Sequence, residues 1–173
     1  MTDNKDLIQA LRDVPDFPKP GIIFKDITPL LGNGKLFKKV IGELADECAA
    51  KGITKIVGIE ARGFIFGAAL AYAMGIGFVP CRKKGKLPYK TVSTSFELEY
   101  GSAVIEMHCD ALSCADKVVV VDDLLATGGT SNAAIDLVRQ LGAEVVLCAF
   151  VCELSFLKGG EKLKAPYKSL LPL

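Results

Sequence analysis

Two adjacent carboxylates and two adjacent glycines follow a run of four valines in the stretch VVVVDDLLATGGT at residues 118–130. The valines predict a strand buried on both faces, and ligands of open α/β sheets bind at the carboxyl ends of such strands. The glycines let the backbone approach a ligand, and free N–H groups at the start of the following helix favour a phosphate. Asp122 and Asp123 could accept hydrogen bonds from two sugar hydroxyls or bind Mg²⁺ through water. The residues expected to contact a sugar phosphate are Asp122, Asp123, Ala126, Thr127, Gly128, Gly129 and Thr130.

The same residues also have a purely structural interpretation. Gly128 and Gly129 could form only a tight turn, Thr130 only a helix N-cap, and the acidic pair only a solvated loop start. Each feature alone is more often structural, but their combination in this order after a valine run favours a binding site. The stretch is neither a Walker A loop, because the lysine of that motif is missing, nor a dinucleotide-binding G-x-G-x-x-G motif.

A cluster of positive charge lies upstream, where five cations fall within nine residues: Arg82, Lys83, Lys84, Lys86 and Lys90. Such a run is usually a solvated face or a nucleic-acid patch. We expect Lys84 and Lys90 to face solvent.

These residues must be positioned by the elements around them, and short apolar runs alternate with helical patterns along the chain. The alternation predicts an α/β, Rossmann-like fold with a mainly parallel sheet flanked by helices. The predicted strands cover residues 55–59, 77–81, 117–121 and 144–151, and the predicted helices cover 35–48 and 130–141. Residues 91–100 and 102–108 are rich in β-forming residues and predict an antiparallel hairpin or lid.

Two other segments need an interpretation of their own. Leu7, Ile8, Leu11 and Val14 share one helical face, so the sequence predicts a helix there and an extended arm over residues 21–31. Residues 63–81 carry no charge and are long enough for a membrane span, but glycines and a proline interrupt them. We therefore expect a buried helix followed by a buried strand.

Length and composition indicate one domain over residues 1–173. Within it we assign an N-terminal arm to residues 1–34 and a basic loop and lid to residues 82–108. The 173 residues are 50% hydrophobic and 24% charged, which excludes disorder for most of the chain. A net charge of +1 argues against a nucleic-acid binder, whose domain is usually strongly basic.

The six cysteines are even in number, but no secretory signal is visible in the first residues. We therefore expect reduced, buried thiols in a cytoplasmic protein that does not contact a membrane. The chain has no CxxC pair and only one histidine, His108, which leaves almost no ligands for zinc.

The stretch at 118–130 resembles the 5-phosphoribosyl-1-pyrophosphate (PRPP) motif of the type I phosphoribosyltransferases. Residues 17–29, 60–64, 82–88 and 96–101 resemble, in the same order, the members of that family that act on adenine. The resemblance implies purine salvage, in which the phosphoribosyl group of PRPP passes to N9 of adenine and AMP and pyrophosphate form. It further implies Mg²⁺ bound mainly through PRPP, small-molecule substrates only, and a homodimer.

The resemblance also implies a role for each matching residue. The acidic pair would hold the ribose hydroxyls, and the loop at 126–130 would hold the 5′-phosphate. With a PRPP motif, pyrophosphate becomes the better partner for the charge run, because cations there would stabilise a leaving group that departs with several negative charges. It would contact Arg62, Arg82, Lys83 and Lys86. Adenine would lie between Phe24 and Leu124, with its edge on the backbone of Ile23 and Lys25; many members have Arg at the position of Lys25. The lid would bring Glu99, as the catalytic carboxylate, and Tyr100 over the reactants.

Two other functions stay open from the sequence. The same fold could act on hypoxanthine, guanine or xanthine, although the arm at residues 22–25 favours adenine. A non-catalytic PRPP sensor would need an added DNA-binding domain, and the residues before Phe17 are expected to be too few for one.

Overall fold

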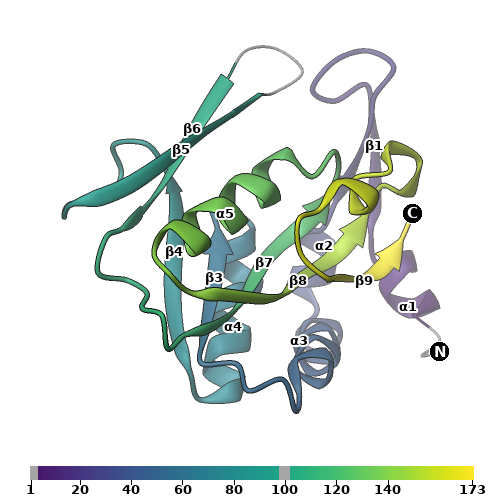
Figure 1. Ribbon diagram of the computed structural model, residues 1–173. Helices are drawn as coiled ribbons and strands as arrows, with labels where there is room; N and C mark the ends of the chain where they lie inside the picture. Colours follow the sequence, from purple (N-terminus) through teal and green to yellow (C-terminus); the bar gives the residue numbers. More distant parts are fainter. Residues whose placement is uncertain (1–3, 98–101) are drawn as a thin grey trace.

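The computed structural model describes residues 4–97 and 102–173 (Figure 1). Its helices are α1 (Lys5–Gln9), α2 (Thr28–Gly32), α3 (Gly34–Cys48), α4 (Gly63–Met74) and α5 (Gly129–Gln140), with short 3-10 turns η1 (Ser155–Leu157) and η2 (Gly160–Lys162). Its strands are β1 (Arg12–Pro15), β2 (Ile23–Asp26), β3 (Lys55–Ile59), β4 (Gly77–Lys83), β5 (Thr91–Glu97), β6 (Ser102–His108), β7 (Lys117–Leu125), β8 (Glu144–Glu153) and β9 (Tyr167–Pro172).

A seven-stranded sheet with the order β5-β6-β4-β3-β7-β8-β9 forms the centre of the molecule. The five strands from β4 to β9 in this order run parallel, and the hairpin of β5 and β6 continues the sheet antiparallel at one edge. The predicted α/β fold with a mainly parallel sheet and an antiparallel hairpin is therefore confirmed.

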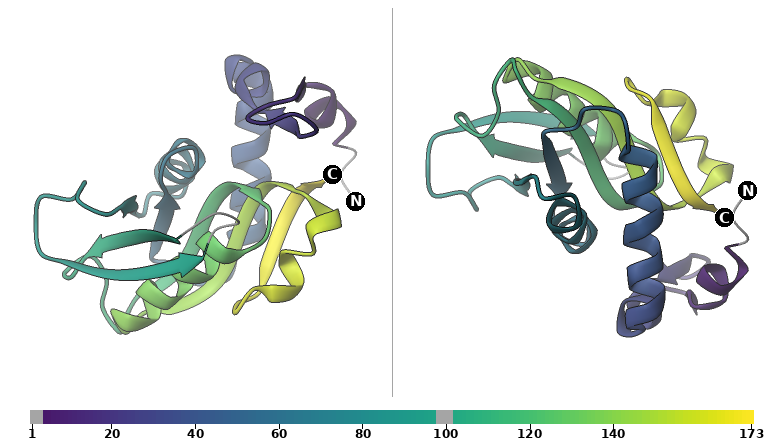
Figure 2. Two further views of the ribbon diagram at one scale, coloured as in Figure 1. Left: turned by 90° about the horizontal axis from the view of Figure 1, so that it is seen from above. Right: turned by 90° about the horizontal axis from the view of Figure 1, so that it is seen from below.

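Helices cover both faces of this sheet, α5 on one and α3 and α4 on the other (Figure 2). The valines of β7 alternate between the two cores, because successive side chains of a strand point to opposite faces. Val118 and Val120 pack with α5, and Val119 and Val121 pack with α3 and α4. All four are completely buried, as the sequence predicts for a strand covered on both sides.

The uncharged stretch at residues 63–81 forms α4 and then β4, as predicted. The expected burial holds only in part, because α4 buries one face and leaves Tyr72 90% exposed, and only Val79 and Cys81 of β4 are buried. Gly75 ends the helix with a φ of 67°, a left-handed conformation that glycine adopts readily. None of the helices in the described part of the chain has both the length and the apolar character needed to cross a bilayer.

The N-terminal segment differs from its prediction. The helix ends at Gln9, and Val14 lies instead in β1, opposite Phe24 of β2. Ion pairs of 2.6 Å, Arg12 with Asp26 and Lys25 with Asp13, join these two strands. The expected arm at 21–31 is extended only over β2, because Thr28–Gly32 forms α2, whose first turn accommodates a proline. Strand β9 was not predicted.

The cysteines also differ in part from the expectation of buried thiols. All six are free, but Cys109 and Cys114 are exposed, because they lie in the loop that leaves β6 rather than in the core. The other four are buried, and burial raises the pKa of Cys81 and Cys148 to about 12, so these thiols stay protonated.

The strand order brings three distant parts of the chain together at one edge of the sheet. Strand β3 lies between β4 and β7 and pairs with both in parallel. The segments that leave the carboxyl ends of β3 and β4 therefore lie beside the acidic pair of β7. The residues that the sequence analysis assigns to pyrophosphate lie here: Arg62 follows β3, Arg82 and Lys83 end β4, which is two residues longer than predicted, and Lys86 follows β4.

Candidate active site

A small hollow of about 70 Å³ lies where β7 passes into α5. It is lined by Asp122, Leu124, Ala126, Thr127, Gly128, Gly129, Thr130 and Ser131. The loop thus forms a concave surface at a helix N-terminus, where N–H groups and the helix dipole favour an anion. We call this feature the phosphate hollow.

The wall of the phosphate hollow rests on a second segment, the turn at Gly159. Gly128 has a φ of 84°, and a Cβ on it would lie 2.9 Å from the carbonyl oxygen of Gly159. A Cβ on Gly159 would in turn collide with the carbonyl oxygen of Ala126. The side chain of Asn132 in α5 holds the residues that come after the turn at Gly159. It donates to the carbonyl of Lys162 at 2.9 Å and accepts from the amide of Lys164 at 2.9 Å. The loop is therefore held from outside by close backbone contact.

The acidic pair lies within β7, which continues to Leu125, and not beyond the end of the strand as the sequence suggested. Asp123 is only 4% exposed, and its Oδ2 lies 2.9 Å from Nε of Arg62. This Oδ2 is buried and makes no hydrogen bond, so the contact is an ion pair without hydrogen-bond alignment. Removal from water raises the pKa of both carboxyls, that of Asp122 further because of the charge on Asp123. An unsatisfied oxygen of this kind suits a hydroxyl donor.

Arg62 connects the acidic pair to the N-terminal arm. Its guanidinium carbon lies 5.1 Å from the ring centre of Phe24, within cation–π range. Gly63 allows this placement, because a Cβ there would lie 2.8 Å from the carbonyl oxygen of Val121 and 2.9 Å from Oδ1 of Asp122. The start of α4 can therefore lie directly against β7.

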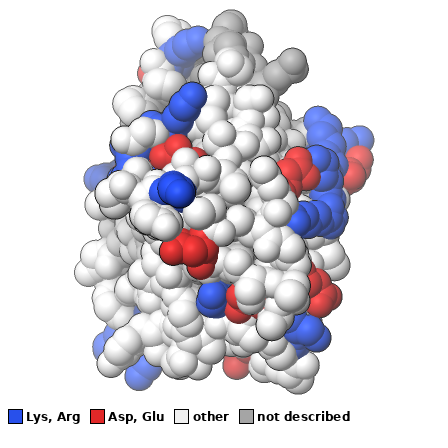
Figure 3. Space-filling model, turned by 60° about the vertical axis from the view of Figure 1, so that its left-hand side comes forward, with Lys and Arg blue, Asp and Glu red and all other residues white. Residues whose placement is uncertain are grey.

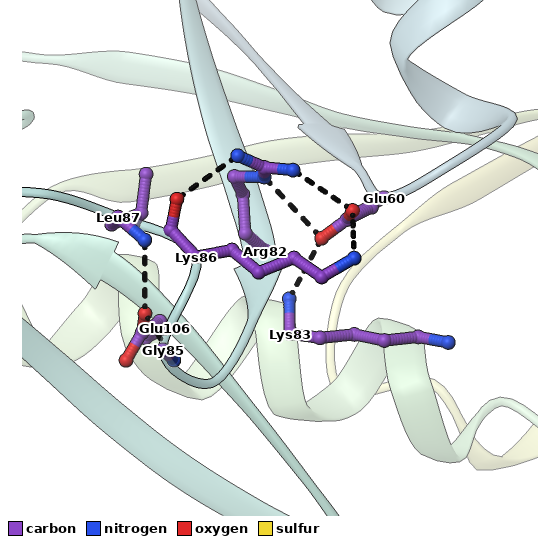
Figure 4. A network of polar contacts seen from close by, with 7 residues as sticks. All are labelled: Glu60, Arg82, Lys83, Gly85, Lys86, Leu87 and Glu106. Atoms are coloured by element: carbon purple, nitrogen blue, oxygen red, sulfur yellow. Dashed lines mark hydrogen bonds and ion pairs between the residues drawn. The ribbon is translucent and has the colours of Figure 1, made fainter.

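The basic loop, which includes the last two residues of β4, is gathered around the carboxylate of Glu60 (Figure 4). Arg82 donates to it at 3.0 and 3.3 Å, Lys86 at 2.9 Å, and the amide of Lys83 at 3.0 Å. The hydrogen bond from Arg82, supported by Lys86 and Lys83, lowers the pKa of Glu60 to about 2. The side chain of Glu106 in β6 also holds this loop, because its Oε1 accepts a hydrogen bond from the backbone amide of Gly85 at 2.9 Å.

A larger cavity of about 540 Å³ joins these parts. It is lined by Ile59, Glu60, Ala61, Arg62, Lys83, Phe96, Ala103, Val104, Ile105, Asp122, Asp123 and Thr130. It shares Asp122 and Thr130 with the phosphate hollow, so the two spaces are neighbours. We call it the site cavity; its lining combines acidic and basic side chains with residues of the β5–β6 hairpin.

The four residues expected around adenine do not line one common cavity. Phe24 lies against Arg62, whereas Leu124 lines the phosphate hollow. Ile23 and Lys25 line a third cavity, of about 700 Å³, together with apolar residues that include Phe156 and Leu157. The side chain of Lys25 is paired with Asp13, so this residue can offer a base its backbone groups.

The expected lid residues Glu99 and Tyr100 lie outside the described residues. The strands on either side of them, β5 and β6, form the predicted hairpin, with Thr91 opposite His108 and Phe96 opposite Ala103. Phe96 and Ala103 both line the site cavity, so the hairpin borders the space in which the expected reactants would lie.

Among residues 4–97 and 102–173, no three metal-ligating side chains gather around one point. The carboxylates of Asp122 and Asp123 nevertheless fit Mg²⁺ at a distance of one water, because both line the site cavity and Oδ2 of Asp123 makes no hydrogen bond. Most ligands of such an ion would have to come from a bound phosphate compound and water.

Charge on the protein surface is mixed in sign. On the face drawn in Figure 3, Lys and Arg atoms lie close to Asp and Glu atoms, and uncharged residues cover most of the surface. Lys84 and Lys90 are both exposed, as expected. The positive charge of the basic loop is partly balanced by Glu60, so it is a local feature and not part of a broad basic surface.

Three residues of this site were missed by the sequence analysis: Glu60, Glu106 and Gly159. Glu60 directly follows a predicted strand, and the rule that ligands bind at carboxyl ends of strands could have identified it. Glu106 and Gly159 act through contacts with distant parts of the chain, and no local pattern marks them.

Comparison with known proteins identifies the family of this fold and site. A family model described as a phosphoribosyl transferase domain matches residues 30–171. A protein of Solidesulfovibrio magneticus named adenine phosphoribosyltransferase is 61% identical over 160 residues, which are 92% of this chain and 94% of that protein. The chain belongs to the adenine phosphoribosyltransferase family.

Solved structures of adenine phosphoribosyltransferases have the same fold over nearly the whole chain. The structure from Rhodothermus marinus has a TM-score of 0.93 and 52% identity and covers 97% of each chain. The structure from Saccharomyces cerevisiae, solved with an imino-altritol bisphosphate and adenine, has a TM-score of 0.91 and 45% identity and covers 96% of this chain and 97% of that one. The family resemblance expected from the motifs is therefore confirmed.

Proposed function

We propose that this protein transfers the 5-phosphoribosyl group of PRPP to N9 of adenine, releasing pyrophosphate and forming AMP in purine salvage. One observation carries the proposal: the phosphate hollow, the acidic pair and the basic loop border adjoining spaces at the edge formed by β3, β4 and β7. These are the groups needed for a ribose that carries a phosphate at one end and a pyrophosphate at the other. The named relatives at high identity support adenine as the acceptor.

PRPP binding follows from the chemistry of these groups. The 5′-phosphate would accept N–H and hydroxyl donors of Ala126–Thr130 in the phosphate hollow. The ribose hydroxyls would donate to Asp122 and Asp123, which supplies the hydrogen-bond donor that Oδ2 of Asp123 lacks. The pyrophosphate would face Arg62, Arg82, Lys83 and Lys86, of which Arg62 and Lys83 line the site cavity.

Adenine would stack on Phe24, with Leu124 on its other face and the backbone of Ile23 and Lys25 at its edge. Arg62 lies against the Phe24 ring, so the base would lie directly beside the pyrophosphate-binding cations. Stacking of a base on an aromatic ring contributes about 1–3 kcal/mol. The cavity beside Ile23 and Lys25 has no lining residue in common with the site cavity. Adenine bound in this way would contact residues of both regions.

The reaction breaks the bond between C1′ and the pyrophosphate oxygen and forms a bond between C1′ and N9 of adenine, which loses its proton. An oxocarbenium-like ribosyl centre develops, and the cations stabilise the departing negative charge. Glu99 would receive the purine proton or stabilise the positive charge on the ribosyl ring. Closure of the lid, which includes Tyr100, would exclude water. Mg²⁺, bound by PRPP oxygens and through water by Asp122 or Asp123, would neutralise part of the pyrophosphate charge. No covalent intermediate on the enzyme is required.

The proposal includes the wider setting of the protein. We expect one catalytic domain over residues 1–173, in which residues 1–34 contribute to the base site and residues 82–108 form the basic loop and lid. We also expect a homodimer in the cytoplasm whose partners are small molecules.

A pyrophosphate-release assay with PRPP, Mg²⁺ and each purine in turn tests the function. Turnover with adenine and AMP as the product is the expected result. Turnover with hypoxanthine or guanine but not adenine would refute the base assignment. The absence of turnover with every purine, together with tight PRPP binding, would favour a sensor.

A further inference from the structure

Glu60 has no role in the proposed reaction, yet its carboxylate is the point at which the basic loop is assembled (Figure 4). Oε1 accepts from Arg82 at 3.0 Å and from Lys86 at 2.9 Å. Oε2 accepts from Arg82 at 3.3 Å and from the amide of Lys83 at 3.0 Å. The side chain of Glu60 is only 9% exposed, whereas those of Arg82 and Lys86 are 30% and 50% exposed. One shielded anion therefore holds two cations that are open to solvent.

The two cations keep donors for a second anion. A guanidinium has five N–H donors, and Arg82 uses three of them, two on Glu60 and one on the carbonyl of Lys86 at 3.0 Å. An ammonium has three, and Lys86 uses one. Among the described contacts, both side chains are therefore held in place and still have unused N–H donors.

The location of Glu60 connects this cluster to the site cavity. Glu60 directly follows β3 and lines the cavity beside Ala61, Arg62 and Lys83. Arg82 belongs to β4, and Lys86 to the loop that follows. The carboxylate thus ties the ends of two neighbouring strands together at the place where a pyrophosphate would lie.

We propose that Glu60 is a positioning residue, which orients Arg82 and Lys86 so that their remaining donors bind the pyrophosphate of PRPP. The inference rests on the proposed function. A long cationic side chain held in advance loses less conformational freedom when its ligand arrives, so preorganisation raises affinity for that ligand. Glu60 therefore acts on the pyrophosphate end of PRPP and has no direct effect on adenine.

The Glu60→Gln variant tests this role, because it removes the charge and keeps the size of the side chain. We expect the KM for PRPP and the inhibition constant of pyrophosphate to rise about tenfold, while the KM for adenine stays within twofold. Glu47→Gln is the matched control, since Glu47 of α3 also forms an ion pair, 3.0 Å from Lys168, but lies away from the site. It should leave all three constants unchanged.

A double-mutant cycle separates positioning from a general loss of structure. Lys86→Met should raise the KM for PRPP, and adding Glu60→Gln to it should raise that KM by less than Glu60→Gln does alone, because only the effect through Arg82 remains. If Glu60→Gln does not fold, Glu60→Asp carries the test, with an expected rise of about threefold for PRPP and none for adenine.

Each outcome of these measurements decides between the explanations. The inference would be overturned if Glu60→Gln changed the KM for PRPP and the KM for adenine equally, or if it left all three constants unchanged like its control. It would also be overturned if the KM of the double variant equalled the product of the two single effects. Failure of the unmodified protein to release pyrophosphate from PRPP and adenine would instead refute the proposed function.

Discussion

The turn at Gly159 supports the phosphate hollow, so replacing Gly159 with alanine tests whether the loop must stay where the structure has it. The added Cβ would collide with the carbonyl oxygen of Ala126 and lie 3.2 Å from the amide nitrogen of Gly128. A carbon and a carbonyl oxygen normally stay about 3.3 Å apart, so the turn and the loop must separate by about 1 Å. All of the atoms in this contact belong to the backbone, and no side chain can rotate away to relieve it.

The size of the effect follows from this displacement. A shift of about 1 Å in a positioning group can lower the catalytic rate about 10²-fold. We therefore expect kcat/KM for PRPP to fall about 10²-fold in Gly159→Ala. Overpacking of this kind costs about 1–3 kcal/mol of folding free energy, which lowers the melting temperature by several degrees in a protein of this size.

Steady-state kinetics with PRPP and adenine varied separately, together with thermal unfolding, measures both effects. Gly42→Ala is the matched control, because a Cβ on Gly42 of α3 meets nothing within 4 Å. A folded Gly159→Ala variant whose kcat/KM for PRPP lies within twofold of the unmodified protein would show that the loop position is not critical.

Three further predictions concern single substitutions. The raised pKa of Asp122 means that the folded protein binds this proton more tightly than the unfolded chain, so Asp122 costs stability as pH rises from about 4 through its folded pKa. Thermal unfolding of Asp122→Asn should therefore show a higher melting temperature at pH 7 and no difference near pH 3, and the variant should lose PRPP turnover; a lower melting temperature at pH 7 would contradict this. Gly42→Ala should raise stability by about 1 kcal/mol, because Gly42 is an exposed interior residue of a helix, and a loss in denaturant unfolding would refute this. Glu99→Ala should lower kcat about 10²-fold and Glu97→Ala far less, and equal effects would refute the role given to Glu99.

The parts of the fold that the sequence predicts correctly are those whose local pattern agrees with their final burial. Val118–Val121 are apolar without interruption and lie between two helical layers. Residues 35–48 repeat apolar side chains at helical spacing, and Asn33 starts the helix by accepting from the amides of Lys35 and Leu36 at 3.1 and 3.3 Å. In both cases the local sequence is sufficient to predict the element.

The parts that the sequence misses depend on contacts between distant residues. Val14 continues a helical pattern, but pairing with Phe24 places it in a strand. Strand β9 forms because β8 offers an edge for parallel pairing, with Cys148 opposite Tyr167. In the candidate site, the motif at 118–130 predicts the phosphate hollow, whereas the contact between Gly159 and Ala126 appears only when the chain is folded.

The edge formed by β3, β4 and β7 has a consequence for the thermodynamics of the whole molecule. The proposed PRPP contacts come from three strands that lie far apart in the sequence. No short fragment of the chain can therefore form the site, and the unfolded chain has no binding site for PRPP. Any ligand that binds there stabilises the paired sheet by the full free energy of its binding at the prevailing concentration. The concentration of PRPP in the surroundings therefore sets, in part, how stable this protein is.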